Sequence, residues 1–160
     1  MARPSCIPDT NSLNLNRKHQ PCLVNLVIED PMSPSHALAI FLGCGIGGIL
    51  RVFFSVWTPT LGSSGFPWAT LFANLMGALL LGLMAGLGFY PTSTHRTAWV
   101  FVSVGFCGGL TTFSTMQLEL FDLLKTARAG LAIEYLLASS ILGPIAIALG
   151  YRIGTFFPAM

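Results

Sequence analysis

The sequence predicts an all-α integral membrane protein with four transmembrane helices, the third of which is broken. Hydrophobic residues make up 53% of the 160 residues, charged residues make up 9%, and the mean hydropathy is +0.71. A soluble domain usually carries about 25% charged residues. The apolar residues gather in four runs, each near the ~20 residues that cross a bilayer core as a helix. One run contains adjacent glycines and adjacent threonines, which weaken a helix.

The N-terminal 35 residues differ from everything after them. Residues 1–35 are rich in Pro, Asn, Ser and charge, and they hold no long apolar run. We expect a disordered tail, or a tail that results from a mis-assigned start, because Met32 directly precedes the first apolar run. The four-helix domain is expected to occupy residues 36–157.

The expected helices cover residues 36–57, 67–89, 97–124 and 130–157, and short links join them. Each helix carries two glycines four residues apart, a spacing that lets helix backbones approach closely. The pairs are Gly43 and Gly47, Gly82 and Gly86, Gly105 and Gly109, and Gly150 and Gly154. We therefore expect all four helices to pack tightly against other helices.

The third segment holds the functional centre in our interpretation. Between Gly105 and Glu119, the pair Gly108-Gly109 is followed by Thr111-Thr112 at the expected membrane depth. A helix interrupted there would free carbonyl oxygens, which in hydrocarbon must find another helix, water or an ion. A plain anchor helix would carry leucine at these positions.

Polar side chains also occur inside the second and fourth segments. Asn74 offers two amide donors and an acceptor from the second segment. Tyr135, Ser139 and Gly143 fall on one stripe of the fourth at four-residue steps, next to Pro144. Helix–helix hydrogen bonds are the alternative role for these residues. Donors without formal charge suit a path for a small anion, because they replace part of its hydration shell and still release it.

Aromatic and hydroxyl side chains follow the expected interruption in the third segment. Phe113 and Met116 are three residues apart and share a face if the helix resumes there. Ser114 and Thr115 add hydroxyls beside the Phe113 ring, whose edge carries partial positive charge and can face an anion. Core packing is the alternative role for Phe113 and Met116.

The charged residues flank the apolar centres. Arg51 lies near the end of the first run, where it either snorkels to the headgroups or draws anions toward an entrance. Glu119 either faces water at the end of the third-segment motif or lines a vestibule. We find no catalytic arrangement and expect no enzyme, and the formal net charge of +2 implies no nucleic-acid partner. A small proton-coupled multidrug exporter would need a carboxylate inside the first segment, and the nearest ones, Glu29 and Asp30, precede it.

The loop charges are too balanced to set one orientation. Counting from Met32, Arg96 and Arg152 fall on the side of the termini, and Arg51, Lys125 and Arg128 fall nearer the other side. Such balance suits a chain that inserts in both orientations. Four helices leave little interior for a pathway, so we expect an oligomer, and a closed two-fold is the commonest arrangement.

At these residues the sequence resembles the Fluc/CrcB fluoride channels. The resemblance covers roughly residues 36–157 and rests on residues 105–115 with Glu119, on residues 70–77, and on the glycines of residues 43–51 with the closing Arg51. It implies an antiparallel, dual-topology homodimer with two pores in the bacterial inner membrane. It also implies passive, selective export of fluoride, and a structural Na⁺ bound by the backbone carbonyls of Gly108 and Thr111.

The resemblance also assigns a fluoride pathway to Asn74, Phe113, Tyr135 and Ser139. The family's second pore phenylalanine falls at Met116, whose polarizable thioether fills similar space without a ring edge. A serine often found further along falls at Gly143, so one hydroxyl is missing. These departures leave open a non-conducting subunit, or one that needs a paired sister subunit to conduct.

Overall fold

The computed structural model describes residues 33–58, 65–89 and 95–157. Within them lie four helices long and apolar enough to cross a membrane: Pro34–Trp57, Trp68–Gly86, Arg96–Lys125 and Ala129–Phe156. The four predicted spans are therefore confirmed, each end within three residues of its expected position. Nearly all of the expected tail, residues 1–35, lies outside the described residues and stays a prediction.

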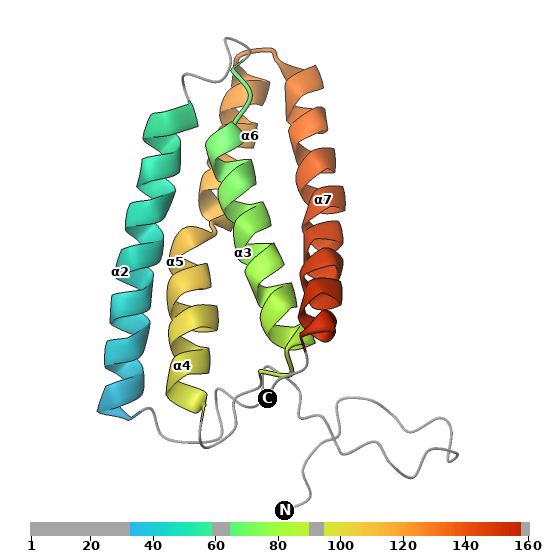
Figure 1. The fold of residues 1–160 in the computed structure, drawn as a ribbon. Helices are drawn as coiled ribbons and strands as arrows, with labels where there is room; N and C mark the ends of the chain where they lie inside the picture. The colour runs from blue at the N-terminus through green and yellow to red at the C-terminus, as the bar shows by residue number, and fades with distance from the viewer. Residues whose placement is uncertain (1–32, 59–64, 90–94, 158–160) are drawn as a thin grey trace, which may run out of the picture. The chain divides into compact units, whose positions relative to one another are not determined.

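The four spans alternate in direction (Figure 1). The first span is α2 (Pro34–Trp57), the second is α3 (Trp68–Gly86) and the fourth is α7 (Ala129–Phe156). The third consists of α4 (Arg96–Val100), a π-helical stretch η2 (Phe101–Cys107), α5 (Gly108–Leu110) and α6 (Phe113–Lys125). Because short links force neighbours to run antiparallel, α2 runs parallel to the third span, and α3 runs parallel to α7.

Glycine pairs bring each of these parallel partners into backbone contact. A Cβ placed on Gly43 would lie 2.5 Å from the Phe101 carbonyl oxygen, and one on Gly109 would lie 2.5 Å from the Cys44 carbonyl oxygen. Between α3 and α7, a Cβ on Gly82 would overlap the Ile147 carbonyl oxygen, and one on Gly150 would overlap the Leu79 carbonyl oxygen. The predicted close packing through glycine pairs is confirmed, and the structure adds which pairs meet.

Two extended residues separate α5 from α6. Thr111 has φ −82° and ψ 154°, and Thr112 has φ −153° and ψ 117°. Gly108 and Gly109 lie within α5, so the weak point of the Gly-Gly-Leu-Thr-Thr stretch is at its threonines. Their hydroxyls and a side chain of α3 supply the hydrogen bonds that the helix loses there.

The largest apolar cluster lies between α3, α6 and α7. Its buried members are Leu71, Met116, Leu120, Leu123, Ala132 and Tyr135. The outer surfaces of α2 and α7 carry large exposed apolar side chains such as Phe41, Ile49 and Ile145. These surfaces suit contact with lipid, because the bilayer core that a spanning helix crosses is hydrocarbon and contains no water.

Candidate functional site

A cavity of about 370 Å³ lies between α3, α7 and the extended residues of the third span. Its lining combines an amide, hydroxyls, a ring and a thioether with aliphatic side chains, and none of the described residues that line it is charged. The lining residues are Leu71, Asn74, Leu75, Ala78, Leu81, Thr111, Thr112, Phe113, Met116, Ser139, Ser140, Gly143 and Ile147. Residues far apart in sequence thus meet around one uncharged, partly polar space.

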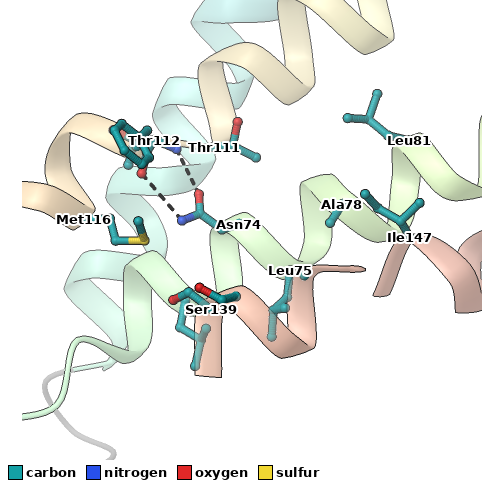
Figure 2. Close-up of a pocket in the computed structure, with 13 residues that line it drawn as sticks. Asn74, Leu75, Ala78, Leu81, Thr111, Thr112, Met116, Ser139 and Ile147 are labelled. Carbon is teal, nitrogen blue, oxygen red and sulfur yellow. Dashed lines mark hydrogen bonds between the residues drawn. The ribbon is translucent and has the colours of Figure 1, made fainter. Parts of the chain in front are cut away.

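Asn74 holds the backbone of Thr112 at two points, as Figure 2 shows. The Thr112 N–H donates to Asn74 Oδ1 at 2.9 Å, and Asn74 Nδ2 donates to the Thr112 carbonyl oxygen at a longer 3.5 Å. The first bond satisfies the Thr112 N–H, which lacks a helical partner, and the second adds a donor to the Thr112 carbonyl oxygen, which as the N-cap carbonyl also begins α6. An amide nitrogen carries two hydrogens, so Asn74 retains a second donor at the cavity wall.

The side chain of Thr112 caps α6. The Thr115 N–H donates to Thr112 Oγ1 at 3.2 Å, and the Thr112 hydroxyl donates to Thr115 Oγ1 at 3.0 Å. The Thr111 hydroxyl instead donates backward to the Cys107 carbonyl oxygen at 2.8 Å. The Thr112 side chain is therefore the N-cap of α6, a role for which the threonine hydroxyl is favoured at helix starts.

These bonds divert two amides from the partners that a continuous helix would give them. In an uninterrupted helix the Thr112 N–H would bond to the Gly108 carbonyl, and the Thr115 N–H would bond to the Thr111 carbonyl. Both amides are engaged elsewhere, with Asn74 and with Thr112 Oγ1. The two carbonyls assigned to sodium on the sequence are therefore released from helical bonding, and carbonyl oxygens are the ligands that a hard cation prefers.

Ser139 brings an unpartnered hydroxyl to the cavity from α7. Its Oγ is buried and has no hydrogen-bond partner in the part of the chain that the structure describes. Buried hydroxyls are normally satisfied, so an orphan at a cavity wall points to a missing water or ligand. Ser139, Met116 and Asn74 all line the cavity that Figure 2 draws.

Phe113 and Met116 both line the cavity, but their environments differ. Phe113, the first residue of α6, keeps 70% of its surface exposed. Met116, one turn later, is 9% exposed and belongs to the apolar cluster with Leu71 and Tyr135. Met116 therefore contributes to the core and to the cavity wall at once, whereas the Phe113 ring has little of the protein around it.

A second polar cluster joins α3, α6 and α7 through the carboxylate of Glu119. The Thr70 hydroxyl donates to Glu119 Oε1 at 2.7 Å, and the Tyr135 hydroxyl donates to Glu119 Oε2 at 2.8 Å. Thr70 is 5% exposed and Tyr135 is fully buried. Tyr135 packs edge-on against Phe66 and does not line the cavity. Each carboxylate oxygen thus has a hydroxyl donor, which lowers the cost of a charge at this depth.

Besides Tyr135, Glu119 and Gly108, three more of the residues predicted from the sequence do not line the cavity. Ser114 is exposed on α6, and Thr115 is half-buried with its hydroxyl engaged by Thr112. Arg51 lines a separate groove on α2 together with Cys44, Gly45 and Gly48. The structure thus brings together Asn74, Thr111, Phe113, Met116 and Ser139, and it pairs Tyr135 with Glu119.

Two residues of the site were not singled out from the sequence. Thr70 precedes Asn74 by four residues, so both lie on one face of α3, and this spacing was the available signal. Ser140 also lines the cavity, although the four-residue spacing places only Ser139 on the polar stripe. A stripe of residues at four-residue steps marks one line along a helix. It therefore leaves out an adjacent residue that also reaches a wide cavity.

Comparison with known proteins finds a family model that matches the chain and several similar relatives. Residues 38–151 match the family model described as "CrcB-like protein, Camphor Resistance (CrcB)". The chain is 37% identical over 123 residues to a fluoride-specific ion channel FluC of Thermus thermophilus, an alignment that covers 77% of this chain and 96% of that relative. It is 37% identical over 116 residues to fluoride-specific ion channel FluC 1 of Nitrobacter hamburgensis, covering 72% of this chain and 92% of the relative. A similar relative in Trichlorobacter lovleyi is 41% identical over 103 residues, which are 64% of this chain and 82% of the relative.

Proposed function

We propose that this chain, which belongs to the CrcB family, is a fluoride-selective ion channel that lowers cytoplasmic fluoride by passive export. The observation that carries the proposal is the unpartnered Ser139 hydroxyl at the wall of an uncharged cavity. Hydrogen fluoride is a weak acid that crosses membranes neutral and dissociates in the cytoplasm. A channel then lets the trapped anion leave down its electrochemical gradient, so no catalytic group is needed and the protein is not an enzyme.

The fluoride pathway runs through the cavity. Ser139 donates its free hydroxyl, Asn74 donates its second amide hydrogen, and the edge of the Phe113 ring faces the anion. Met116 lines the same path with its thioether, and it also belongs to the buried cluster that contains Tyr135. Neutral donors substitute for hydration without the tight hold of a lysine or arginine, which favours release.

Export as a homodimer is supported by the polar residues left uncovered on α6. Ser114 and Gln117 are exposed in the middle of the described third span, next to the exposed Phe113. Polar side chains in hydrocarbon are costly, so a second copy that covers this face stabilises them and brings Ser114 and Thr115 to the pathway. A two-fold assembly presents the same face from both copies. The balanced loop charges fit an antiparallel, dual-topology arrangement in a bacterial inner membrane.

The broken third span has a place in this assembly. The carbonyls of Gly108 and Thr111, released from helical bonds, would hold a structural Na⁺, which would neutralise their partial negative charge within the membrane. Gly108 is exposed, and a Cβ added there would meet nothing within 4 Å, so its backbone is accessible from outside the subunit. Arg51 and Glu119, toward the same end of the helices, would form the vestibule.

The proposal is tested by fluoride efflux from liposomes that hold the purified protein. Vesicles are loaded with potassium fluoride, efflux is started with a potassium ionophore, and the released anion is read with a fluoride electrode. We expect fluoride efflux, and no efflux when chloride replaces fluoride. Ser139→Ala should lower the rate, whereas Ser55→Ala, which removes an exposed hydroxyl on α2, should not.

Absence of fluoride efflux from a folded, dimeric protein would overturn conduction by this chain alone. Co-expression with a paired sister chain then separates a heterodimer-requiring subunit from a non-conducting one. Proton-driven drug export is the less favoured alternative, because α2, the first span, contains no Asp or Glu.

A further inference from the structure

Two residues of α3, one helical turn apart, contact the two extended residues of the third span. Asn74 contacts Thr112 through its amide, and Gly77 lies against the methyl group of Thr111. Residues three apart share a helix face, so α3 presents both contacts from the same side. Each extended residue is therefore held by its own contact with α3.

The Asn74 contact determines which backbone groups remain free. Its Oδ1 accepts the Thr112 N–H, which a continuous helix would direct to the Gly108 carbonyl. Its Nδ2 occupies the Thr112 carbonyl oxygen as well. Without these bonds the Thr112 amide would return to Gly108 and the helix would close across the interruption, because an unpaired amide is costly in a membrane.

The Gly77 contact determines the position of Thr111. A Cβ added to Gly77 would overlap the Thr111 Cγ2 methyl and no other side chain. The methyl cannot simply rotate away, because the hydroxyl on the same Cβ is bonded to the Cys107 carbonyl oxygen at 2.8 Å. A threonine has a stiff χ1, so moving one of these groups moves the other.

We infer that Asn74 and Gly77 form a seat on α3 that holds Thr111 and Thr112 extended and keeps the Gly108 carbonyl out of the helix. Asn74 is thus a positioning residue that acts through the Thr112 backbone, beyond any direct contact of its second amide hydrogen with an anion. The consequence for Na⁺ and for fluoride rests on the proposed function. The seat itself does not, because it concerns only contacts within this chain.

The Gly77–Thr111 contact is tested with a double-mutant cycle on the full-length protein. Gly77→Ala should lower the unfolding midpoint in detergent and slow fluoride efflux by roughly tenfold, because the new methyl overpacks against Thr111. In a Thr111→Ser background, which lacks the methyl and keeps the hydroxyl, the same Gly77→Ala change should cost far less in both measurements. Gly130→Ala, at a helical glycine with open space, is the matched control and should not lower the midpoint.

Equal effects of Gly77→Ala in the two backgrounds would overturn the seat. This outcome is readable from the unfolding midpoints even if the parent protein moves no fluoride, so failure of the seat and failure of the channel function are distinguishable.

The role of Asn74 is tested by the dependence of the unfolding midpoint on sodium. We expect the parent midpoint to be higher in sodium chloride than in N-methylglucamine chloride, and Asn74→Ala to abolish this difference as well as lower the midpoint. A sodium-dependent rise that survives in Asn74→Ala would show that Asn74 does not control the carbonyls. An unchanged midpoint in Asn74→Ala without sodium would show that the Thr112 contact holds nothing.

Discussion

The two halves of the contact between α3 and α7 are built in different ways. In the C-terminal halves the backbones meet, since a Cβ on Gly154 would lie 2.8 Å from the Gly86 carbonyl carbon and 2.6 Å from the Leu83 carbonyl oxygen. Toward the N-terminal ends a cavity lies along both helices, lined by Asn74 from α3 and Ser139 from α7 and reaching as far as Leu81 and Ile147. Figure 1 shows the two ribbons converging toward their C-terminal ends. Glycine pairs therefore bring the C-terminal halves of α3 and α7 (the closed half) into backbone contact. The absence of such pairs leaves room for a polar site in the N-terminal halves (the open half).

The largest expected effect is a difference in the free energy of unfolding between two variants, each of which adds one methyl group to a different half of α7. Gly150→Ala places a Cβ on the Leu79 carbonyl oxygen, where backbone must shift, so we expect a loss of about 1–3 kcal/mol in the free energy of unfolding. Gly130→Ala adds the same group in the N-terminal half, where nothing lies within 4 Å, and we expect no loss and a gain of up to about 1 kcal/mol from helix propensity. Titration with a denaturing detergent measures both variants. Equal destabilisation by the two would contradict the difference between the halves.

In the open half, hydrogen bonds rather than glycine contacts should stabilise the packing of α3 and α7. Tyr135→Phe removes the donor to Glu119 Oε2 in a fully buried position, so we expect a loss of about 1–3 kcal/mol in the free energy of unfolding. Tyr151→Phe, at an exposed position of the closed half, is the matched control. The same detergent titration compares them. If Tyr151→Phe costs as much as Tyr135→Phe, the carboxylate cluster does not stabilise the open half.

Glycine spacing illustrates both what the sequence could reveal and what it could not. The four pairs predicted close packing because a four-residue spacing places two glycines on one helix face, and all four pairs lie in backbone contacts. Which pairs meet could not be read from the spacing, because every pair has the same chemistry. Which pairs meet depends on the alternating direction of the spans. This alternation lets α3 pack in parallel against α7, although the whole third span separates the two helices in sequence.

The polar residues show a similar limit. Asn74 and Ser139 were recognised because an amide and a hydroxyl are unusual in apolar runs, and both line the cavity. Thr70 was missed as the partner of Glu119, 49 positions away, because threonine alone is common in membrane helices. The interruption was expected around Gly108 as well as Thr111, yet only the threonines are extended, since the hydrogen bonds from Asn74 come from another helix.

Two methionines with the same exposed fraction test whether the cavity has spare room. Met116 lines the cavity and Met84 lies in the cluster with Trp99 and Val100, and each is 9% exposed. Met116→Phe should leave fluoride efflux intact or raise it, because a ring edge replaces the thioether beside open space. Met84→Phe should instead lower the free energy of unfolding by about 1–3 kcal/mol through overpacking. Efflux assays and detergent titration measure the two effects, and an inactive Met116→Phe channel beside an active parent would contradict the assignment of Met116 to the pathway.

The smallest expected effect concerns the helix ends at the two halves. α3 ends at the closed half with Gly88 at φ +69°, where the Gly88 N–H bonds to the Ala85 carbonyl and the Phe89 N–H bonds to the Met84 carbonyl. α6 ends near the open half with the same bond pattern, but its left-handed residue is Ala127 at φ +58°. A Cβ in this region is strained, and only part of that strain is offset by the smaller entropy of the unfolded alanine chain. Ala127→Gly should therefore raise the free energy of unfolding by about 0.5–1 kcal/mol.

The matched control for this change is Ala148→Gly, at an exposed helical position of α7, which should lower the free energy of unfolding by about 1 kcal/mol. Opposite signs for the two alanine-to-glycine changes would show that the backbone of the turn before α7 is left-handed, as Gly88 is after α3. A loss in both variants would mean that the turn is not strained, and the two halves would then differ only in how α3 and α7 pack. Fluoride efflux should be unchanged in Ala127→Gly, because the turn lies outside the residues that line the cavity.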